Sequence, residues 1–413
     1  MKTKRILILV ITILFYCVLT SDVVTAEPPT DTPSNNLCKL LKSGKLDVHF
    51  RSYYLNRRFS EPRTERSMAV GGWLGYETPS FHGLSACLVG YTSQGLIFTN
   101  PDQDGARLLA PGQKGYTVLG QAYAQFEIDK IKLKAYRQQI DTPFINPHDV
   151  RMTPLTFEAY TLEYTATPKL SFMASYVTKM KDWNNSSFKS MSEAAGYPGS
   201  NDSVTMGGVI FIPHDRYKFQ FWNYYCHEFM NVIYIQGDAR WDLTDSLSLT
   251  GSIQAFDQQD VGKAIAGNFH TGMGGLQAVA GWRGLDITLG FTITSKGHDM
   301  INPWGAYPGW TSIMEEDCDL AGEKAWVVGL AYDFEHIGIK GLSAFTNHTS
   351  SYVPPGGWFS STDQAETDFT IDYHFPGTLK GLWLRLRTAY VNNSFDTGGE
   401  DYHDYRAIIN YNF

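Results

Sequence analysis

The chain has 413 residues and a formal net charge of −8; aromatic residues make up 14% of it, charged residues only 18%, and glycine is frequent at 38 residues. Abundant aromatic side chains argue against disorder, the lack of a run of about 18 apolar residues excludes a helical membrane bundle, and the acidic balance argues against a nucleic-acid-binding protein. The composition favours a β protein in which one closed sheet occupies most of the chain.

The first 26 residues have the features of an export signal. A basic start precedes an apolar stretch from Ile6 to Leu19, which is too short to span a membrane as a helix, and small residues follow at Val24, Thr25 and Ala26. We expect residues 1–26 to be a cleaved signal peptide. Residues 27–44 are expected to be a flexible periplasmic leader, because the segment begins with a polar, proline-rich stretch.

The cysteines that follow the signal lie far apart and form no CxxC pair, so the sequence supports no zinc or redox motif. Export makes disulfides chemically possible. The spacing leaves open whether any of them pair: Cys38, Cys87, Cys226 and Cys318. We expect neither a metal nor a cofactor.

From residue 45 to residue 413 the chain consists of segments in which apolar and polar side chains alternate. Between Leu382 and Arg387 every second residue is leucine, and the same alternation places Tyr405, Ile409 and Phe413 on one face. A strand sorts alternate residues onto opposite faces, whereas a helix distributes them around its circumference. We count about eighteen such segments of about ten residues, which start near residues 45, 67, 81, 116, 130, 157, 169, 203, 217, 228, 245, 271, 285, 323, 337, 365, 380 and 402.

The connections between these segments alternate in length. Short turns occur at Thr78-Pro79, Arg283-Gly284 and Glu335-His336, among others, and long loops occur at 92–115, 139–156, 179–202, 257–270, 296–322 and 348–364. Short turns at one end and long loops at the other are typical of outer-membrane barrels. The sequence therefore predicts an all-β fold, a transmembrane antiparallel up-and-down β-barrel of about eighteen strands over residues 45–413.

The chain ends in an aromatic residue, Phe413, at the end of the last alternating segment. This ending resembles the terminal signature that the barrel assembly machinery reads in bacterial outer-membrane barrels. We therefore expect export through a cleaved signal peptide to a bacterial outer membrane, where the barrel contacts lipid. The sequence leaves open whether three barrels associate as a homotrimer.

Several strings are similar to those of the OprD-type porins, the outer-membrane carboxylate channel family. Asp47 to Phe59 resembles that family's first strand, Asp141 to Tyr160 its third, inward-folding loop, and Gly322 to Trp326 the start of the strand after its seventh loop. Lys380 to Arg387 and Asp404 to Phe413 resemble its last two strands. The resemblance implies a porin for small water-soluble solutes, with a constriction loop inside the lumen and a basic ladder on its wall.

Four arginines on the alternating segments indicate a substrate path. Charged residues on transmembrane strands face the lumen, and closure makes the last two strands neighbours of the first. The arginines therefore form a column on one wall near mid-height, where the family carries its ladder: Arg51, Arg385, Arg387 and Arg406. Guanidinium groups bind carboxylates, and a row of them passes anions from site to site. The alternative is that each arginine pairs with a lumen carboxylate such as Asp47 or Glu366.

The resemblance implies that loop 139–156 folds into the lumen, where His148, Asp149 and Arg151 would line the narrowest point. The alternative role of these residues is ordinary polar lining or loop hydrogen bonding. The seventh loop carries an acidic run, which is either simply solvated or folded inward to face the column. An inward run would create a transverse field that aligns zwitterions such as amino acids; its residues are Glu315, Glu316, Asp317 and Asp319.

The sequence thus predicts a porin rather than an enzyme, with small carboxylates, amino acids or peptides as solutes. A purely structural or adhesive barrel is another alternative. An embedded hydrolase would need a nucleophile and a base at a defined spacing, and we find no such pair in the sequence. A plugged transporter would need a plug domain before residue 45, and the segment between the signal peptide and residue 45 is too short to form one. The main alternative is a sugar or oligosaccharide channel with an aromatic slide of lumen-facing rings, which Trp222, Tyr224, Trp241 and Trp383 would supply.

Overall fold

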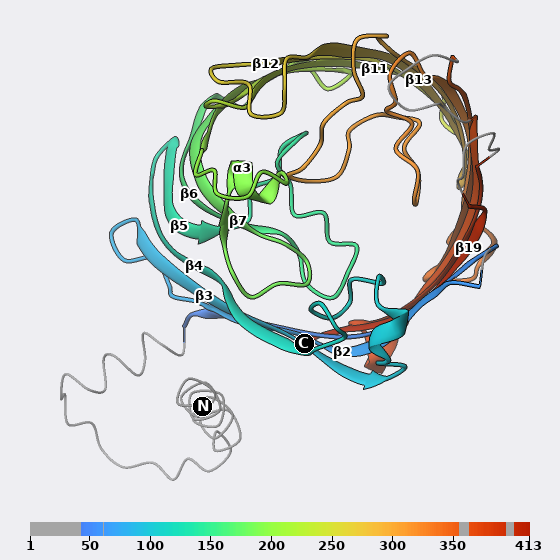
Figure 1. The fold of residues 1–413 in the computed structure, drawn as a ribbon, viewed down its shortest axis with the longest axis horizontal. Coiled ribbons are helices and arrows are strands. Elements are labelled where there is room, and N and C mark those ends of the chain that lie inside the picture. The colour runs from blue at the N-terminus through green and yellow to red at the C-terminus, as the bar shows by residue number, and fades with distance from the viewer. Residues whose placement is uncertain (1–42, 61, 355–362, 394–399) are drawn as a thin grey trace. The chain divides into compact units, whose positions relative to one another are not determined.

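The computed structural model describes residues 43–60, 62–354, 363–393 and 400–413. The predicted signal peptide and nearly all of the predicted leader lie outside these residues. Gly44–Phe413 form one compact unit, which Figure 1 shows as a ring of strands viewed along its axis.

One antiparallel sheet closes on itself to form this ring. β1 (Lys45–Phe59) pairs with β2 (Thr64–Glu77) along one edge and with β19 (Tyr402–Asn412) along the other. Eighteen strands form the closed wall, and the short β8 (Lys189–Ser190) pairs with the end of β7. The other barrel strands are β3 (Leu84–Ile97), β4 (Tyr116–Ile128), β5 (Ile131–Gln138), β6 (Thr156–Thr167), β7 (Leu170–Lys181), β9 (Val204–His214), β10 (Tyr217–Cys226), β11 (Met230–Thr244), β12 (Leu247–Asp260), β13 (His270–Trp282), β14 (Leu285–Thr294), β15 (Lys324–Asp333), β16 (Leu342–Tyr352), β17 (Gln364–His374) and β18 (Leu382–Asn393).

The prediction of about eighteen antiparallel strands is confirmed. The largest displacement of a strand start is at β16, which was expected near residue 337 and begins at Leu342. The intervening turn contains the short helix η2 (Phe334–Ile337) and Gly338, whose φ of 94° lies in the left-handed region. The other short helices are η1 (Pro101–Gln103), α3 (Met191–Ala194) and η3 (Gly377–Leu379).

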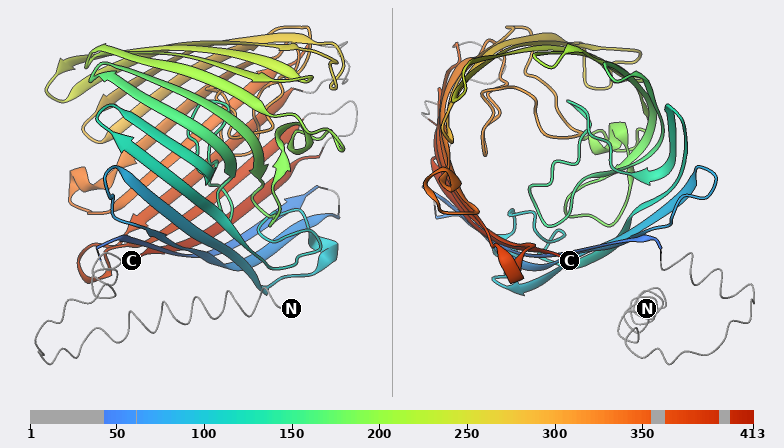
Figure 2. Two further views of the ribbon diagram at one scale, coloured as in Figure 1. Left: turned by 90° about the vertical axis from the view of Figure 1, so that its left-hand side faces the viewer. Right: turned by 180° about the vertical axis from the view of Figure 1, so that it is seen from behind.

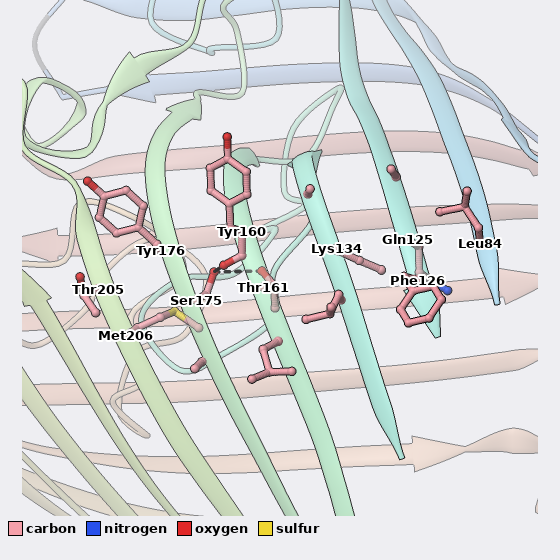
Figure 3. A pocket seen from close by; sticks show the side chains of 15 residues that line it. Leu84, Gln125, Phe126, Lys134, Tyr160, Thr161, Ser175, Tyr176, Thr205 and Met206 are labelled. Atoms are coloured by element: carbon pink, nitrogen blue, oxygen red, sulfur yellow. Dashed lines mark hydrogen bonds between the residues drawn. The ribbon is translucent and has the colours of Figure 1, made fainter. Parts of the chain in front are cut away.

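Large hydrophobic side chains, Ile253 and Leu276 among them, are exposed on the outer face of the barrel, because alternate residues of each strand point away from the lumen. Figure 2 shows the tilt of these strands. Figure 3 shows part of this face, where Leu84, Tyr160 and Tyr176 line a shallow apolar depression of about 600 Å³. At the adjacent strand positions, which point the other way, Thr161 and Ser175 are buried and their hydroxyl groups hydrogen-bond to each other at 2.9 Å. The depression therefore lies on the side predicted to face lipid, outside any path through the lumen.

The two ends of the barrel differ in their connections. At one end tight turns join the strands; Arg283 and Gly284 between β13 and β14 have φ values of 47° and 81°, as the two central residues of a type I′ hairpin turn require. At the other end, called here the loop end, lie loops L2 (98–115), L3 (139–155), L4 (182–203), L6 (261–269) and L7 (295–323).

Loops L3, L4 and L7 enter the lumen and pack there against the wall, as the segments inside the ring in Figure 1 illustrate. Phe144 of L3 contacts the rings of Tyr224, Tyr234 and Phe256, which project inward from β10, β11 and β12. Trp304 of L7 is fully buried and donates its indole N–H to the backbone oxygen of residue 191 at the start of α3, at 2.9 Å. An apolar core therefore fills one side of the lumen.

In the part of the chain that the structure describes, no helix is both long and apolar enough to cross a membrane.

Candidate functional site

The four predicted arginines lie together on the inner wall formed by β18, β19 and β1. The register brings a fifth, Arg57 of β1, into the same group, so that an arginine occurs at each of four successive inward rows along β19. From the loop end, the opposed pairs are Arg57 with Asp404, Arg387 with Arg406, Arg385 with Ile408, and Arg51 with Asn410. Successive inward positions on a strand are about 7 Å apart, so the rows extend over about 20 Å. These five residues are called the arginine column below.

The members of the column differ in their exposure to the lumen. The Arg51 and Arg406 side chains are 7% and 1% exposed, whereas the Arg385 side chain is 31% exposed. Arg385 donates both Nε and one terminal nitrogen to Asp372 of β17 at 2.7 Å. Arg387 donates Nε to the Thr370 hydroxyl at 3.0 Å, and no carboxylate of the described residues lies within ion-pairing distance of it. Arg385 and Arg387 are thus the members most open to a solute.

Loop L3 covers Arg51. The Asp149 carboxylate accepts hydrogen bonds from both terminal nitrogens of Arg51, at 2.7 and 2.9 Å, and the backbone oxygen of Arg151 accepts a third at 2.5 Å. The Tyr53 hydroxyl, also on the inner face of β1, donates to the backbone oxygen of Val150 at 3.2 Å. The fork geometry of guanidinium and carboxylate explains why this pair holds the loop against the wall.

The other two predicted constriction residues, His148 and Arg151, pack against Trp183 of L4. The His148 ring lies edge-on to the indole with 4.9 Å between centroids, and the Arg151 guanidinium lies 5.6 Å from the indole centroid. The Trp183 indole N–H donates to the backbone oxygen of His148 at 2.7 Å. Burial and the nearby Arg151 and Arg107 lower the pKa of His148 to about 4, so this imidazole is neutral at neutral pH.

The predicted acidic run lies inside the barrel, in contact with the column rather than across a gap from it. The Glu315 carboxylate forms ion pairs with Arg57 and Arg406. Glu316 accepts a hydrogen bond from the Tyr402 hydroxyl at 3.1 Å, and Asp317 accepts one from the Ser312 hydroxyl at 2.6 Å.

Burial raises the pKa of Glu316 and of Asp317 above their ordinary values, although these hydrogen bonds partly oppose the shift. Burial also raises the pKa of Asp319 well above its ordinary value, with nearby carboxylates adding to the effect. These three carboxyl groups share burial as the main cause of their shifts, and Glu315 is the member of the run in direct contact with the arginines.

Glu366 of β17 has a different partner from the one that the sequence suggested. Its fully buried carboxylate accepts hydrogen bonds from three consecutive backbone N–H groups of L7, those of Met314, Glu315 and Glu316, at 2.8 to 3.3 Å. Asp47 likewise accepts from the Trp73 indole at 3.0 Å instead of pairing with an arginine. Glu366 therefore anchors the backbone of L7 to the wall.

The rings proposed for an aromatic slide do not form a continuous lumenal surface. Trp241 faces outward and is 41% exposed, which corrects its predicted orientation. Trp222 and Tyr224 face inward but are buried under the loop core. Trp383 faces inward, where it stacks on His374 and lies 5.2 Å from the Arg385 guanidinium.

A polar recess of about 340 Å³ lies at the loop end beside the constriction, between L2, L4 and L7. Its lining includes Arg107, which pairs with Asp182 at 2.6 Å, and Lys189, which pairs with Glu193 at 3.4 Å. Trp183 contributes to the same lining and also contacts the constriction residue His148. The recess is therefore lined by charges of both signs.

The sequence analysis missed Arg57 and the anchoring role of Glu366. Arg57 has the same parity as Arg51 on β1, which is a signal that could have identified it; its place beside a second arginine at the strand end obscured that signal. The contact of Glu366 with L7 has no local signal in the sequence, because 50 to 52 residues separate Glu366 from the L7 residues whose N–H groups it accepts.

The histidine, cysteine and acidic side chains were also compared with the requirements of metal and disulfide sites. No cluster of three or more His, Cys, Asp or Glu side chains suitable for a metal ion occurs among the residues that the structure describes. Cys87, Cys226 and Cys318 are buried free thiols, and Cys38 lies outside the described residues.

Comparison with known proteins places these features in a family context. The family model described as outer membrane porin, OprD family, matches residues 40–413. A search of curated proteins found no match.

Several solved structures share the fold. Pseudomonas aeruginosa OccK9 (OpdG) is 21% identical, with a TM-score of 0.83 over 91% of this chain and 99% of that one. P. aeruginosa OpdK, solved with vanillate, is 20% identical with a TM-score of 0.80 over the same shares. Acinetobacter baumannii OccAB3 is 15% identical, with a TM-score of 0.82 over 90% and 99%.

Proposed function

The chain belongs to the OprD family of outer membrane porins, and on this premise we propose that small carboxylates, amino acids among them, are the solutes that pass along its arginine column. The family and the barrel point to a bacterial outer membrane as the location of the protein. The observation that carries the proposal is the register of β18, β19 and β1, which aligns arginines in four successive inward rows.

The distribution of polar and apolar groups in the lumen supports a path beside the column. Apolar residues of L3, L4 and L7 fill the side of the lumen lined by β6 to β13. The wall of β17, β18, β19 and β1 instead presents the arginine column and the carboxylates of Glu366, Asp372 and Asp404, beside a smaller apolar cluster that includes Leu55 and Ile408. Since guanidinium groups bind carboxylates through paired hydrogen bonds, a carboxylate that enters this side finds a series of similar sites.

Arg385 and Arg387 are the members best placed to contact such a solute. Both side chains are more exposed than those of Arg51 and Arg406. Arg387 also donates to the hydroxyl of Thr370, so its guanidinium group is not paired with a carboxylate among the described residues. Several moderately attractive sites favour passage over deep trapping. Vanillate, present with P. aeruginosa OpdK, is itself an aromatic carboxylate, which is consistent with this class of solute.

The same proposal includes the route by which the barrel reaches the membrane. Residues 1–26 act as a cleaved signal peptide, and the C-terminal residue is read by the barrel assembly machinery. The Phe413 side chain is 76% exposed and lies against Tyr411 with 4.4 Å between ring centroids. Its exposure leaves it accessible to an assembly factor.

The double variant Arg385→Gln/Arg387→Gln tests the solute class. We expect benzoate flux into liposomes to fall about tenfold, since the loss of about 1.4 kcal/mol of stabilisation along the path is a tenfold change in rate. The reversal potential in a KCl gradient should shift toward cation selectivity. Arg387→Gln alone should act in the same direction without leaving a carboxylate unpaired.

The matched control is Arg240→Gln on β11, where an arginine also pairs with a carboxylate, Asp242, at 3.0 Å but lies away from the column. It should leave benzoate flux near that of the unmodified protein. Equal flux through the double variant and the unmodified barrel would contradict the proposal and favour general diffusion.

A further inference from the structure

We propose that Glu315 is a built-in carboxylate ligand of the arginine column, which occupies Arg57 and Arg406 until the carboxylate of a solute displaces it, and thereby sets the carboxylate affinity of the pore. This inference rests on the proposed function and assigns a specificity-determining residue to the same path.

The cluster at the loop end of the column contains more carboxylates than guanidinium groups. Arg57 contacts Glu65 at 3.2 Å and Asp404 at 3.2 Å, and Arg406 contacts Asp404 at 2.7 Å. Glu315 contacts both arginines. Arg57 and Arg406 thus have three carboxylate partners, of which Glu65 also pairs with Arg63 at 3.1 Å. Glu315 is the one of the three that comes from a loop.

Glu315 can leave without disturbing the charge balance of the wall. Glu65 and Asp404 lie on β2 and β19, where strand pairing fixes their backbone, and they would remain in contact with Arg57 and Arg406. A solute carboxylate in place of Glu315 would restore the present arrangement. The exchange replaces one carboxylate with another, so the two arginines are not left as unpaired buried charges.

The backbone of L7 is held in place independently of the Glu315 side chain. Glu366 accepts the N–H groups of residues 314, 315 and 316, and Tyr402 donates to Glu316. Rotation of the Glu315 side chain is therefore sufficient to free the arginines, and L7 need not leave the lumen. This side chain is 8% exposed, as expected for one that occupies a site rather than solvent.

The arginines of the column differ in whether a loop carboxylate lies against them, and this difference is consistent with the proposed role of Glu315. Arg51 is covered by Asp149 of L3, and Arg406 by Glu315 of L7, whereas no loop carboxylate of the described residues lies against Arg385 or Arg387. A solute carboxylate that moves along the column from the loop end must compete with Glu315 at Arg57 and Arg406 before it reaches Arg385 in the next row.

The experiment compares Glu315→Gln with Glu316→Gln in planar bilayers. Both variants remove one carboxylate from neighbouring positions of L7, but only Glu315 contacts guanidinium groups. Benzoate, added on the loop side, serves as the carboxylate probe, and block of KCl current gives its affinity. The reversal potential in a KCl gradient gives chloride permeability, which does not depend on carboxylate recognition.

We expect Glu315→Gln to tighten benzoate block about tenfold and to raise chloride permeability, while Glu316→Gln changes both much less. Glu315→Asp keeps the charge but shortens the side chain; it should fold normally and shift block in the same direction by a smaller factor. Heat-modifiable migration on gels verifies that each variant forms the barrel.

Equal effects of Glu315→Gln and Glu316→Gln on both readouts would overturn the inference while leaving the carboxylate path intact. If benzoate blocks none of the proteins, yet Glu315→Gln gains more chloride permeability than Glu316→Gln, the proposed solute class fails while the masking of Arg57 and Arg406 by Glu315 stands.

Discussion

Two adjacent residues of L3 have different chemical environments. Asp149 is half-exposed and pairs with Arg51 of the wall, whereas the neighbouring His148 ring is packed against Trp183. One residue thus contributes a charged contact to the constriction, and the other a neutral, desolvated one.

At the residue scale, we expect acid to loosen L3 through His148. The pKa of this imidazole is lowered from 6.5 to about 4, so the packed loop favours the neutral form. The contribution of neutral His148 to the stability of the packed loop is present above pH 6.5 and is lost as the pH falls toward 4. This loss amounts to at most about 3 kcal/mol. Single-channel records should therefore show more frequent openings to higher conductance at pH 4 than at pH 7.

His148→Gln should abolish the part of this pH dependence that lies between 6.5 and 4, because glutamine does not titrate. His82, an exposed histidine beside β3, supplies the control, and His82→Gln should retain the dependence of the unmodified protein. A profile that is the same in all three proteins would show that other groups control the loop.

At the scale of elements, L3 is held by two kinds of contact. Its apolar residues, Phe144 and Ile145 among them, belong to the core shared with L4 and L7, and Asp149 ties it to β1. An apolar core excludes water, while the ion pair determines which wall the loop approaches. The loop is consequently held inside the lumen by both kinds of contact.

Deletion of residues 139–155, with a short glycine linker in their place, should raise single-channel conductance and admit larger solutes, because the deletion removes loop atoms that occupy the lumen. Conductance and liposome swelling with sugars of increasing size measure the effect. Shortening the exposed turn 334–341 at the opposite end is the control and should leave both unchanged. An unaltered conductance after the L3 deletion would assign the constriction to L7.

At the scale of the whole molecule, closure depends on the pairing of β19 with β1. Eleven successive residue pairs, from His49 with Asn412 to Phe59 with Tyr402, join the two ends of the sheet. Without this seam both edge strands would expose unpaired backbone groups, which are intolerable in a bilayer. The stability of the barrel is therefore tied to the last strand of the chain.

We expect the full chain to show a β-type circular dichroism spectrum and to migrate faster on gels before heating than after it. Removal of residues 402–413 should abolish the difference in migration, since the sheet can no longer close. Removal of Phe413 alone should leave the difference intact in protein refolded in detergent but lower the amount assembled in cells. A predominantly helical spectrum of the full chain would contradict the barrel.

The sequence by itself determined the strands and, apart from Trp241, the direction of the strand side chains that were assigned to the lumen. Alternation is a local property with a period of two residues, so Arg385, Arg387 and Arg406 could be assigned to the inner wall from their neighbours alone. The strand order also followed, because consecutive antiparallel strands pair with each other. Closure then predicted that β1 and β19 are adjacent, and the register places the four predicted arginines on one wall.

Only the tertiary structure decided which groups cover the column. Loops have no repeating period from which a contact can be read, and their partners are far away in the chain: 98 residues separate Arg51 from Asp149, and 258 separate Arg57 from Glu315. From the sequence, Glu366 could equally have paired with an arginine; in the structure its carboxylate accepts backbone N–H groups of L7. These choices depend on how three loops pack together inside one closed wall, and packing is a property of the whole fold.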